Sequence, residues 1–138
     1  MKLKRNKQAN KLKNNLKQEN NDLMFAYTAA KAAEEKKGEK VLLLDVSKLT
    51  VVADYFLIIS AKSAPQIQAL ANHIEERLTK SDYQMISKEG FVDSNWIVLD
   101  FGNLVVHIMH EREREYYKLE RFWGNATLID NKAWKKAS

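Results

Sequence analysis

Cysteine is absent from this chain of 138 residues. Its absence excludes disulfide bridges, thiolate nucleophiles and cysteine-ligated zinc, and it favours a reducing compartment. Long apolar runs are absent too, because no stretch approaches the roughly 18 residues of a membrane helix. The basic N-terminus also lacks the apolar segment of a secretory signal. We therefore expect a soluble, cytoplasmic protein, with an organellar location as the alternative.

Sequence motifs for catalysis are also missing. The chain has no serine elbow and no glycine-rich phosphate loop. His107 and His110 lie three residues apart at the end of a predicted strand, so they should point to opposite faces and make poor joint metal ligands. His73 falls on the flank of a predicted helix, where we expect it to be solvated. We therefore expect no enzymatic activity, no metal and no cofactor.

The positive charge of the chain is concentrated at its N-terminus. The net charge is +5. Residues 1–20, which we call the basic arm, contain one acidic residue, a glutamate, and seven basic residues: Lys2, Lys4, Arg5, Lys7, Lys11, Lys13 and Lys17. Because its few leucines bury too little surface to offset the entropy of ordering, we expect the arm to be disordered or a frayed helix. It could bind nucleic-acid phosphate through counterion release, or it could be a solvated tail.

Hydrophobic periodicity and turn residues predict a single α/β domain over residues 21–126, followed by a short C-terminal tail over 127–138. The expected helices cover residues 22–37, 64–80 and 111–123, and the expected strands cover residues 40–46, 55–61, 83–87, 95–101 and 104–110. These elements predict a mixed five-stranded sheet with helices packed on it. The strand, helix and strand over residues 55–87 should form a right-handed parallel crossover.

Residues 95–110, NWIVLDFGNLVVHIMH, are typical of a β-hairpin, because Gly102 and Asn103 accept the positive φ angles of a tight turn. Such a turn places alternate residues on opposite faces. One face is wholly apolar and should be covered by helices: Ile97, Leu99, Phe101, Leu104, Val106 and Ile108. The other, which we call the mixed face, carries Trp96, Val98, Asp100, Val105, His107 and Met109.

The mixed face is the candidate binding surface. With only three helices expected, we predict that this face is exposed, as partner-binding surfaces are. The alternative is that a second layer of the protein covers it. Trp96 would be its anchor, or else a buried core residue. Asp100 and His107 should lie diagonally, with Cβ atoms roughly 7 Å apart, but no nucleophile or substrate pocket accompanies them.

Four stretches occur in order along residues 23–126: DYFLIIS, KEGF, WIVLDFGNLVVHIM and YYKLERFW. They resemble the ribosome silencing factor family, also called the Iojap family. The matching residues are Asp54, Tyr55, Phe56, Glu89, Gly90, Trp96, Asp100, Gly102, Val106, His107, Tyr117, Leu119, Glu120 and Trp123. The basic arm departs from the family pattern, since members commonly lack it or vary it.

The resemblance implies a nucleotidyltransferase-like fold without enzymatic activity. It implies a protein that binds the large ribosomal subunit through its fourteenth protein, blocks joining of the small subunit and so represses translation. Asp54, Glu89 and Asp100 would offer carboxylates to a basic ribosomal protein. The arm could contact neighbouring ribosomal RNA, and the free protein could form a homodimer through the mixed face.

Two alternatives stay open at this point. One is an RNA-binding module led by the basic arm. The other is an enzyme of the nucleotidyltransferase type, which would need a Gly-Ser turn followed by paired carboxylates that hold two metal ions. The chain contains neither a Gly-Ser turn nor an Asp-x-Asp pair.

Overall fold

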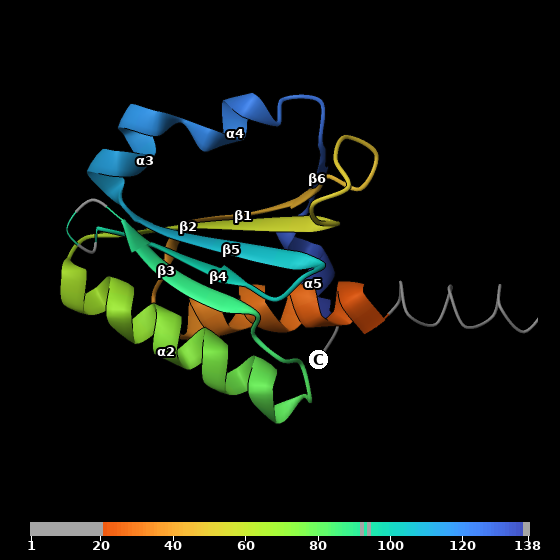
Figure 1. Cartoon of the computed structure of the whole chain (residues 1–138), viewed down its shortest axis with the longest axis horizontal. Coiled ribbons are helices and arrows are strands. Elements are labelled where there is room, and N and C mark those ends of the chain that lie inside the picture. The colour runs from red at the N-terminus through yellow and green to blue at the C-terminus, as the bar shows by residue number, and fades with distance from the viewer. Residues whose placement is uncertain (1–20, 92, 94, 137–138) are drawn as a thin grey trace, which may run out of the picture.

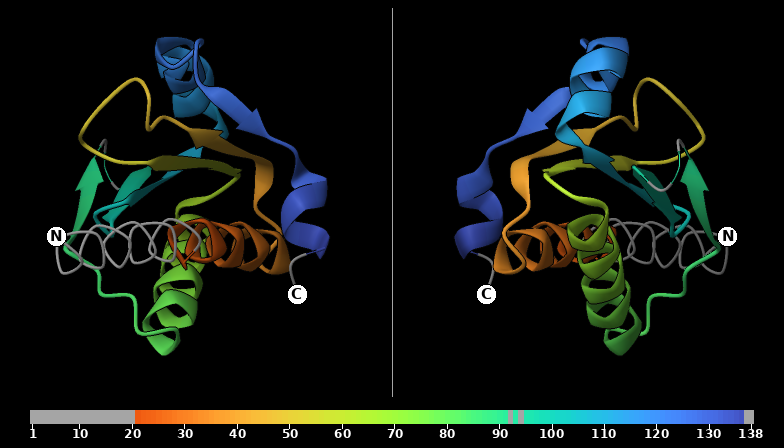
Figure 2. Two further views of the ribbon diagram at one scale, coloured as in Figure 1. Left: turned by 90° about the vertical axis from the view of Figure 1, so that its right-hand side faces the viewer. Right: turned by 90° about the vertical axis from the view of Figure 1, so that its left-hand side faces the viewer.

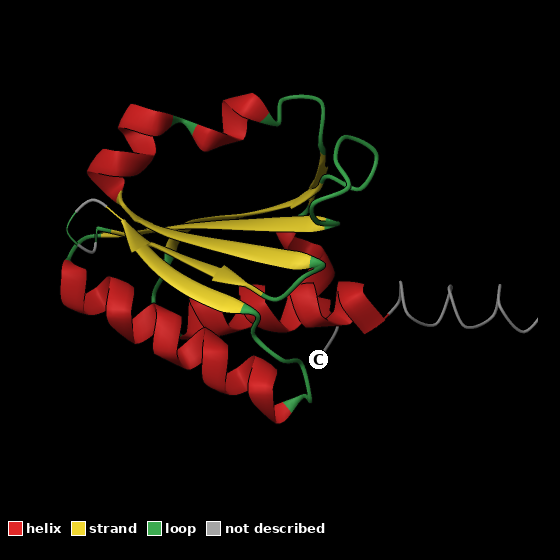
Figure 3. Ribbon diagram, viewed as in Figure 1, coloured by secondary structure: helices red, strands yellow, loops and turns green. Residues whose placement is uncertain are grey.

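The structure is a computed structural model that describes residues 21–91, 93 and 95–136. Its strands are β1 (Glu39–Asp45), β2 (Tyr55–Ala61), β3 (Ser87–Phe91), β4 (Trp96–Asp100), β5 (Leu104–His110) and β6 (Thr127–Ile129). They form one mixed sheet in the order β3-β4-β5-β2-β1-β6, with helices on both faces (Figure 1, Figure 3). No helix in these described ranges is both long and apolar enough to cross a membrane.

One face of the sheet is covered by the first helix (residues 21–35) and by α2 (Ala64–Lys80) (Figure 1). The helix predicted over residues 64–80 is confirmed. The Ser63 hydroxyl caps its start by accepting a hydrogen bond from the Gln66 backbone N–H at 3.2 Å. The apolar stripe of α2 is fully buried and consists of Ile67, Leu70, Ala71, Ile74 and Leu78. This stripe packs in the main core with the wholly apolar face of the hairpin.

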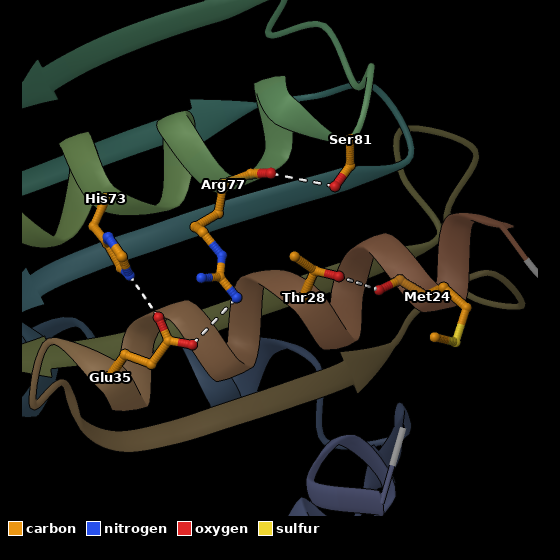
Figure 4. A network of polar contacts seen from close by, with 6 residues as sticks. All are labelled: Met24, Thr28, Glu35, His73, Arg77 and Ser81. Carbon is orange, nitrogen blue, oxygen red and sulfur yellow. Dashed lines mark hydrogen bonds and ion pairs between the residues drawn. The ribbon is translucent and has the colours of Figure 1, made fainter. Parts of the chain in front are cut away.

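Polar contacts join the first helix to α2 (Figure 4). His73 Nε2 lies 2.8 Å from Glu35 Oε2, and Arg77 Nη2 lies 3.3 Å from Glu35 Oε1. The pKa of Glu35 is lowered, first by its hydrogen bond with His73. The expectation that His73 is simply solvated is therefore wrong, because the first helix brings a carboxylate against it.

The predicted strands are confirmed except at β3. That strand was expected over residues 83–87 and instead covers Ser87–Phe91. Tyr83 and Met85 pack against the core from a loop. An edge strand needs little apolar character because few of its residues are buried, so the polar sequence SKEGF concealed it. The crossover from β2 reaches β3 in a parallel direction, with β5 and β4 lying between them.

Residues 127–136 belong to the domain, whereas we expected a tail. β6 pairs with β1 and makes the sheet six-stranded rather than five-stranded. α5 (Asn131–Lys136) lies beside the first helix (Figure 2). It buries Trp134 to 1% exposure, and the indole N–H donates to Glu34 Oε1 at 2.9 Å. Two elements of three and six residues are too short to show a periodicity.

Candidate functional site

The mixed face extends beyond the hairpin across the neighbouring strands. The predicted hairpin register is confirmed, with Val98 opposite His107 and Asp100 opposite Val105. Gly102 has a φ of 90° at the turn, as a tight hairpin requires. The pairing of β3 with β4 adds Glu89 and Phe91 to this face, and the pairing of β2 with β5 adds Phe56 and Ile58.

Two short helices cover one half of the mixed face: α3 (Glu111–Tyr117) and α4 (Leu119–Phe122) (Figure 1). A single helix was expected there, but Lys118 adopts a left-handed conformation between them, with a φ of 49°. Leu119 and Trp123 then pack against a second buried cluster on the sheet. This covered half consists of Leu44, Val46, Ala53, Phe56, Ile58, Val105 and Met109.

A buried arginine ties α3 to the sheet. The Arg114 guanidinium donates to the Ser60 hydroxyl at 3.0 Å and to the backbone carbonyl of Lys40. Lys40 lies at an irregularity in the pairing of β1 and has a φ of 47°. Burial lowers the pKa of Arg114, and the nearby Glu120 carboxylate opposes that shift. Arg114 thus fixes α3 over the covered half, which nothing in its charged sequence EREREYY indicated.

The expectation that the whole mixed face is exposed is wrong for the covered half. Met109 has an exposed fraction of 0%, and that of Val105 is 8%. Both were expected to contact a partner, but their side chains lie in the second cluster with Leu119 and Trp123 nearby. They stabilise the domain, and their surfaces are not available for docking.

The other half of the mixed face, which we call the open half, is only partly covered and forms a patch of rings, aliphatic carbon and carboxylates. Trp96 and Val98 are half-buried there against the second cluster. This β3–β4 patch consists of Glu89, Phe91, Trp96, Val98, Asp100 and Tyr117. The Phe91 side chain is 43% exposed. Its ring centroid lies 5.9 Å from that of Trp96, and the Tyr117 ring centroid lies 5.0 Å from that of Trp96. Aromatic side chains held in this way are typical anchors of protein interfaces.

His107 lies at the boundary between the two halves. The Trp96 indole N–H donates to His107 Nδ1 at 3.1 Å. The Phe56 ring meets the imidazole edge-on, with centroids 5.6 Å apart. Burial lowers the pKa of His107 to about 4, because the interior disfavours the charged imidazolium. The imidazole is therefore neutral at physiological pH and less exposed than we expected.

Asp100 has a partner of its own in the hairpin. Its Oδ1 accepts a hydrogen bond from the Gly102 backbone N–H at 2.8 Å and so stabilises the turn. The structure thus gives Asp100 and His107 separate hydrogen-bond partners. The Asp100 bond closes the hairpin turn and the His107 bond joins Trp96 to β5, so the two side chains share no proton in this arrangement.

The two remaining predicted carboxylates lie in different places. Glu89 is exposed on β3 opposite Val98, within the β3–β4 patch. Asp54 lies outside the patch beside the hairpin turn, where its backbone N–H donates to the Asn103 carbonyl at 2.9 Å. It lines a small hollow with Asp22 and Asp45. The pKa of the neighbouring Tyr55 rises to about 12, mainly through burial and then through the charges of Asp45 and Asp54.

No group of three or more histidine, aspartate or glutamate side chains in the described ranges is arranged to hold a metal ion. The seven basic residues of the arm, predicted to contact RNA, lie outside those ranges. Lys2, Lys4, Arg5, Lys7, Lys11, Lys13 and Lys17 therefore stay a prediction.

Sequence reasoning missed two members of the patch, Phe91 and Tyr117. Phe91 was assigned to a loop because the strand was placed too early. A strand over residues 87–91 would have put Phe91 directly opposite Trp96. Tyr117 is the last residue of α3, and only the break at Lys118 places it beside Trp96. Its sequence therefore held no signal of this position.

Comparison with known proteins gives concordant results. A family model described as "Ribosomal silencing factor during starvation" matches residues 7–138. The protein named Ribosomal silencing factor RsfS from Bacillus subtilis is 42% identical over 102 residues, which are 74% of this chain and 86% of that protein. The maize protein named Protein Iojap, chloroplastic, is 35% identical over 108 residues, which are 78% of this chain and 47% of that protein.

The fold agrees as well. A crystal structure of a protein from Chromobacterium violaceum matches with a TM-score of 0.70 and 33% sequence identity, and the match covers 72% of this chain and 83% of that one. The resemblance predicted from four short motifs is thereby confirmed over most of the chain. The chain belongs to the ribosome silencing factor (Iojap) family.

Proposed function

We propose that this protein is a non-enzymatic ribosome silencing factor of the cytoplasm. It binds the large ribosomal subunit through the fourteenth protein of that subunit, blocks joining of the small subunit and so represses translation. The observation that carries the proposal is the β3–β4 patch, an open aromatic surface on a chain of the ribosome silencing factor family. A body seated at the joining surface represses translation by occupancy, so no chemical step is required.

The chemistry of the patch suits a ribosomal protein. Phe91, Trp96 and Val98 supply apolar surface that a partner can desolvate, and aromatic residues are enriched among interface hot spots. Glu89 and Asp100 place carboxylates beside the rings. Ribosomal proteins are commonly basic, and opposite charges at a rim mainly raise the association rate and fix the register.

Cosedimentation with isolated large subunits tests the proposal, together with a light-scattering assay of subunit joining. Trp96→Ala should weaken binding by about 2 kcal/mol or more and relieve the block in parallel, as expected for a hot spot. Leu128→Ala is the matched control, because Leu128 is 60% exposed at the opposite edge of the same sheet. Chemical crosslinking from Glu89 should recover the fourteenth protein. Failure of the unaltered protein to bind large subunits or to inhibit joining contradicts the proposal.

A further inference from the structure

Trp96 is held in one orientation before any partner arrives. Its indole contacts the rings of Phe91 and Tyr117, and its N–H donates to His107 Nδ1 at 3.1 Å. A tryptophan fixed only by ring contacts could rotate about its side-chain torsions. One directional hydrogen bond removes that freedom, because the N–H points along a single line in the plane of the indole.

The setting of His107 suits it to be a fixed acceptor. Since Nδ1 accepts the indole proton, Nε2 of the neutral ring carries the imidazole hydrogen. The residue sits on β5, paired in register with Val98 on β4 and with Ile58 on β2. The Phe56 ring meets its edge from the covered half. His107 therefore connects the buried cluster of the covered half to Trp96 of the β3–β4 patch.

We propose that His107 is a positioning residue for docking, which orients the Trp96 indole toward the partner by accepting its N–H. This inference rests on the proposed function of the β3–β4 patch. An indole already in its bound orientation loses less side-chain entropy on association, which strengthens binding without a new contact to the partner. It also presents no unsatisfied donor to the interface, since its N–H is already bonded within the domain.

Two substitutions at residue 107 separate positioning from packing. His107→Leu keeps an apolar side chain of similar size and removes the acceptor. His107→Asn is shorter but can place its Oδ1 near the position of Nδ1, so it should restore the hydrogen bond. Thermal unfolding checks that each variant is folded. Trp96→Phe supplies a second route if the leucine variant does not fold, because it removes the N–H and leaves His107 intact.

The first readout is the indole ¹H–¹⁵N signal of Trp96, assigned by its loss in Trp96→Phe. We expect its chemical shift and slow hydrogen exchange to change in His107→Leu and to return toward those of the unaltered protein in His107→Asn. A structural role of His107 alone would not move this signal selectively while those of Trp123 and Trp134 stay in place. An unchanged Trp96 signal in His107→Leu overturns the inference.

The second readout is affinity for isolated large subunits. His107→Leu should weaken binding about fivefold, as expected for one net hydrogen bond, and His107→Asn should recover most of it. Adding His107→Leu to Trp96→Phe should produce no further loss, because the bond is already absent. Equal affinities of the leucine variant and the unaltered protein overturn the inference alone. If the unaltered protein does not bind, the proposed function fails, and with it the docking part of the inference.

Discussion

The two halves of the mixed face are built from similar residues but differ in how far other parts of the chain cover them. In the covered half, Phe56, Val105 and Met109 lie beneath the segment that holds α3 and α4. In the open half, Phe91 is 43% exposed and Trp96 is half-buried, with Tyr117 at the end of α3 against its ring. This difference in coverage arises because α3 and α4, which follow β5 in the chain, pack mainly over one of the halves. Apolar content therefore does not distinguish the buried half from the open half of this face, whereas coverage by later elements does.

Coverage itself depends on a few local features. Lys118 breaks the helix, so that Leu119 and Trp123 turn toward the sheet. Arg114 fastens α3 to Ser60 and to the irregular start of β1. The end of α3 thus contacts the open half through Tyr117, whereas the covered half packs against Leu119 and Trp123.

The largest effect should come from emptying the covered half. Met109→Ala should lower the free energy of unfolding by about 3 kcal/mol, because Met109 is fully buried and its truncation leaves a cavity in the second cluster. Denaturant unfolding measures this, and the folded protein should keep its affinity for large subunits. Leu128→Ala, at an exposed position, should change stability by at most about 0.5 kcal/mol. Unchanged stability with lost binding in Met109→Ala would reverse the roles assigned to the two halves.

We expect the stability of the protein to depend on pH through His107, which lies at the boundary between the two halves. Burial lowers the pKa of His107 from 6.5 to about 4, so between these values the unfolded chain binds more protons than the folded one. The free energy of unfolding should therefore fall as the pH drops from 6.5 to about 4, by up to about 3 kcal/mol from this residue.

Comparing His107→Asn with the unaltered protein isolates this contribution. Urea unfolding between pH 7 and pH 4 gives both stability profiles, and carboxylate titration is common to them. The profile of the asparagine variant should be flatter over the same window. Two parallel profiles would show that His107 titrates normally and that the boundary between the halves is open to water.

A smaller effect should appear at the edge of the open half. Phe91→Ala should weaken large-subunit binding by about 1 kcal/mol and lower stability by less than about 1 kcal/mol, since its side chain is 43% exposed. Phe122→Ala is the matched control, because Phe122 is more exposed but lies on α4 outside the β3–β4 patch. Equal losses of affinity in both variants would mean that docking extends over α4.

Much of the fold could be predicted from the sequence because periodicity reports local geometry. The bounds of α2 and the division of the hairpin into two faces are confirmed. β3 was misplaced because an exposed edge strand carries polar residues, and β6 and α5 were missed because they are short. Alternation correctly grouped Trp96 with Val105 and Met109 on one face. It could not show which of them α3 and α4 would cover, because that depends on the conformation of Lys118 and on long-range contacts of Arg114.

The smallest effect should follow from deleting residues 1–20. If the β3–β4 patch carries docking, deletion should leave affinity for large subunits nearly unchanged at moderate salt. Each arm cation that neutralises an RNA phosphate would contribute about 0.7 to 0.9 to the slope of log affinity against log salt concentration. Cosedimentation over a range of potassium chloride concentrations measures that slope for the full and the shortened chain. A chain with its seven arm cations replaced by glutamine controls for the length of the arm. Equal slopes in all three proteins would support docking through the open half of the sheet. A large drop in the slope for both altered chains would instead assign docking to the arm.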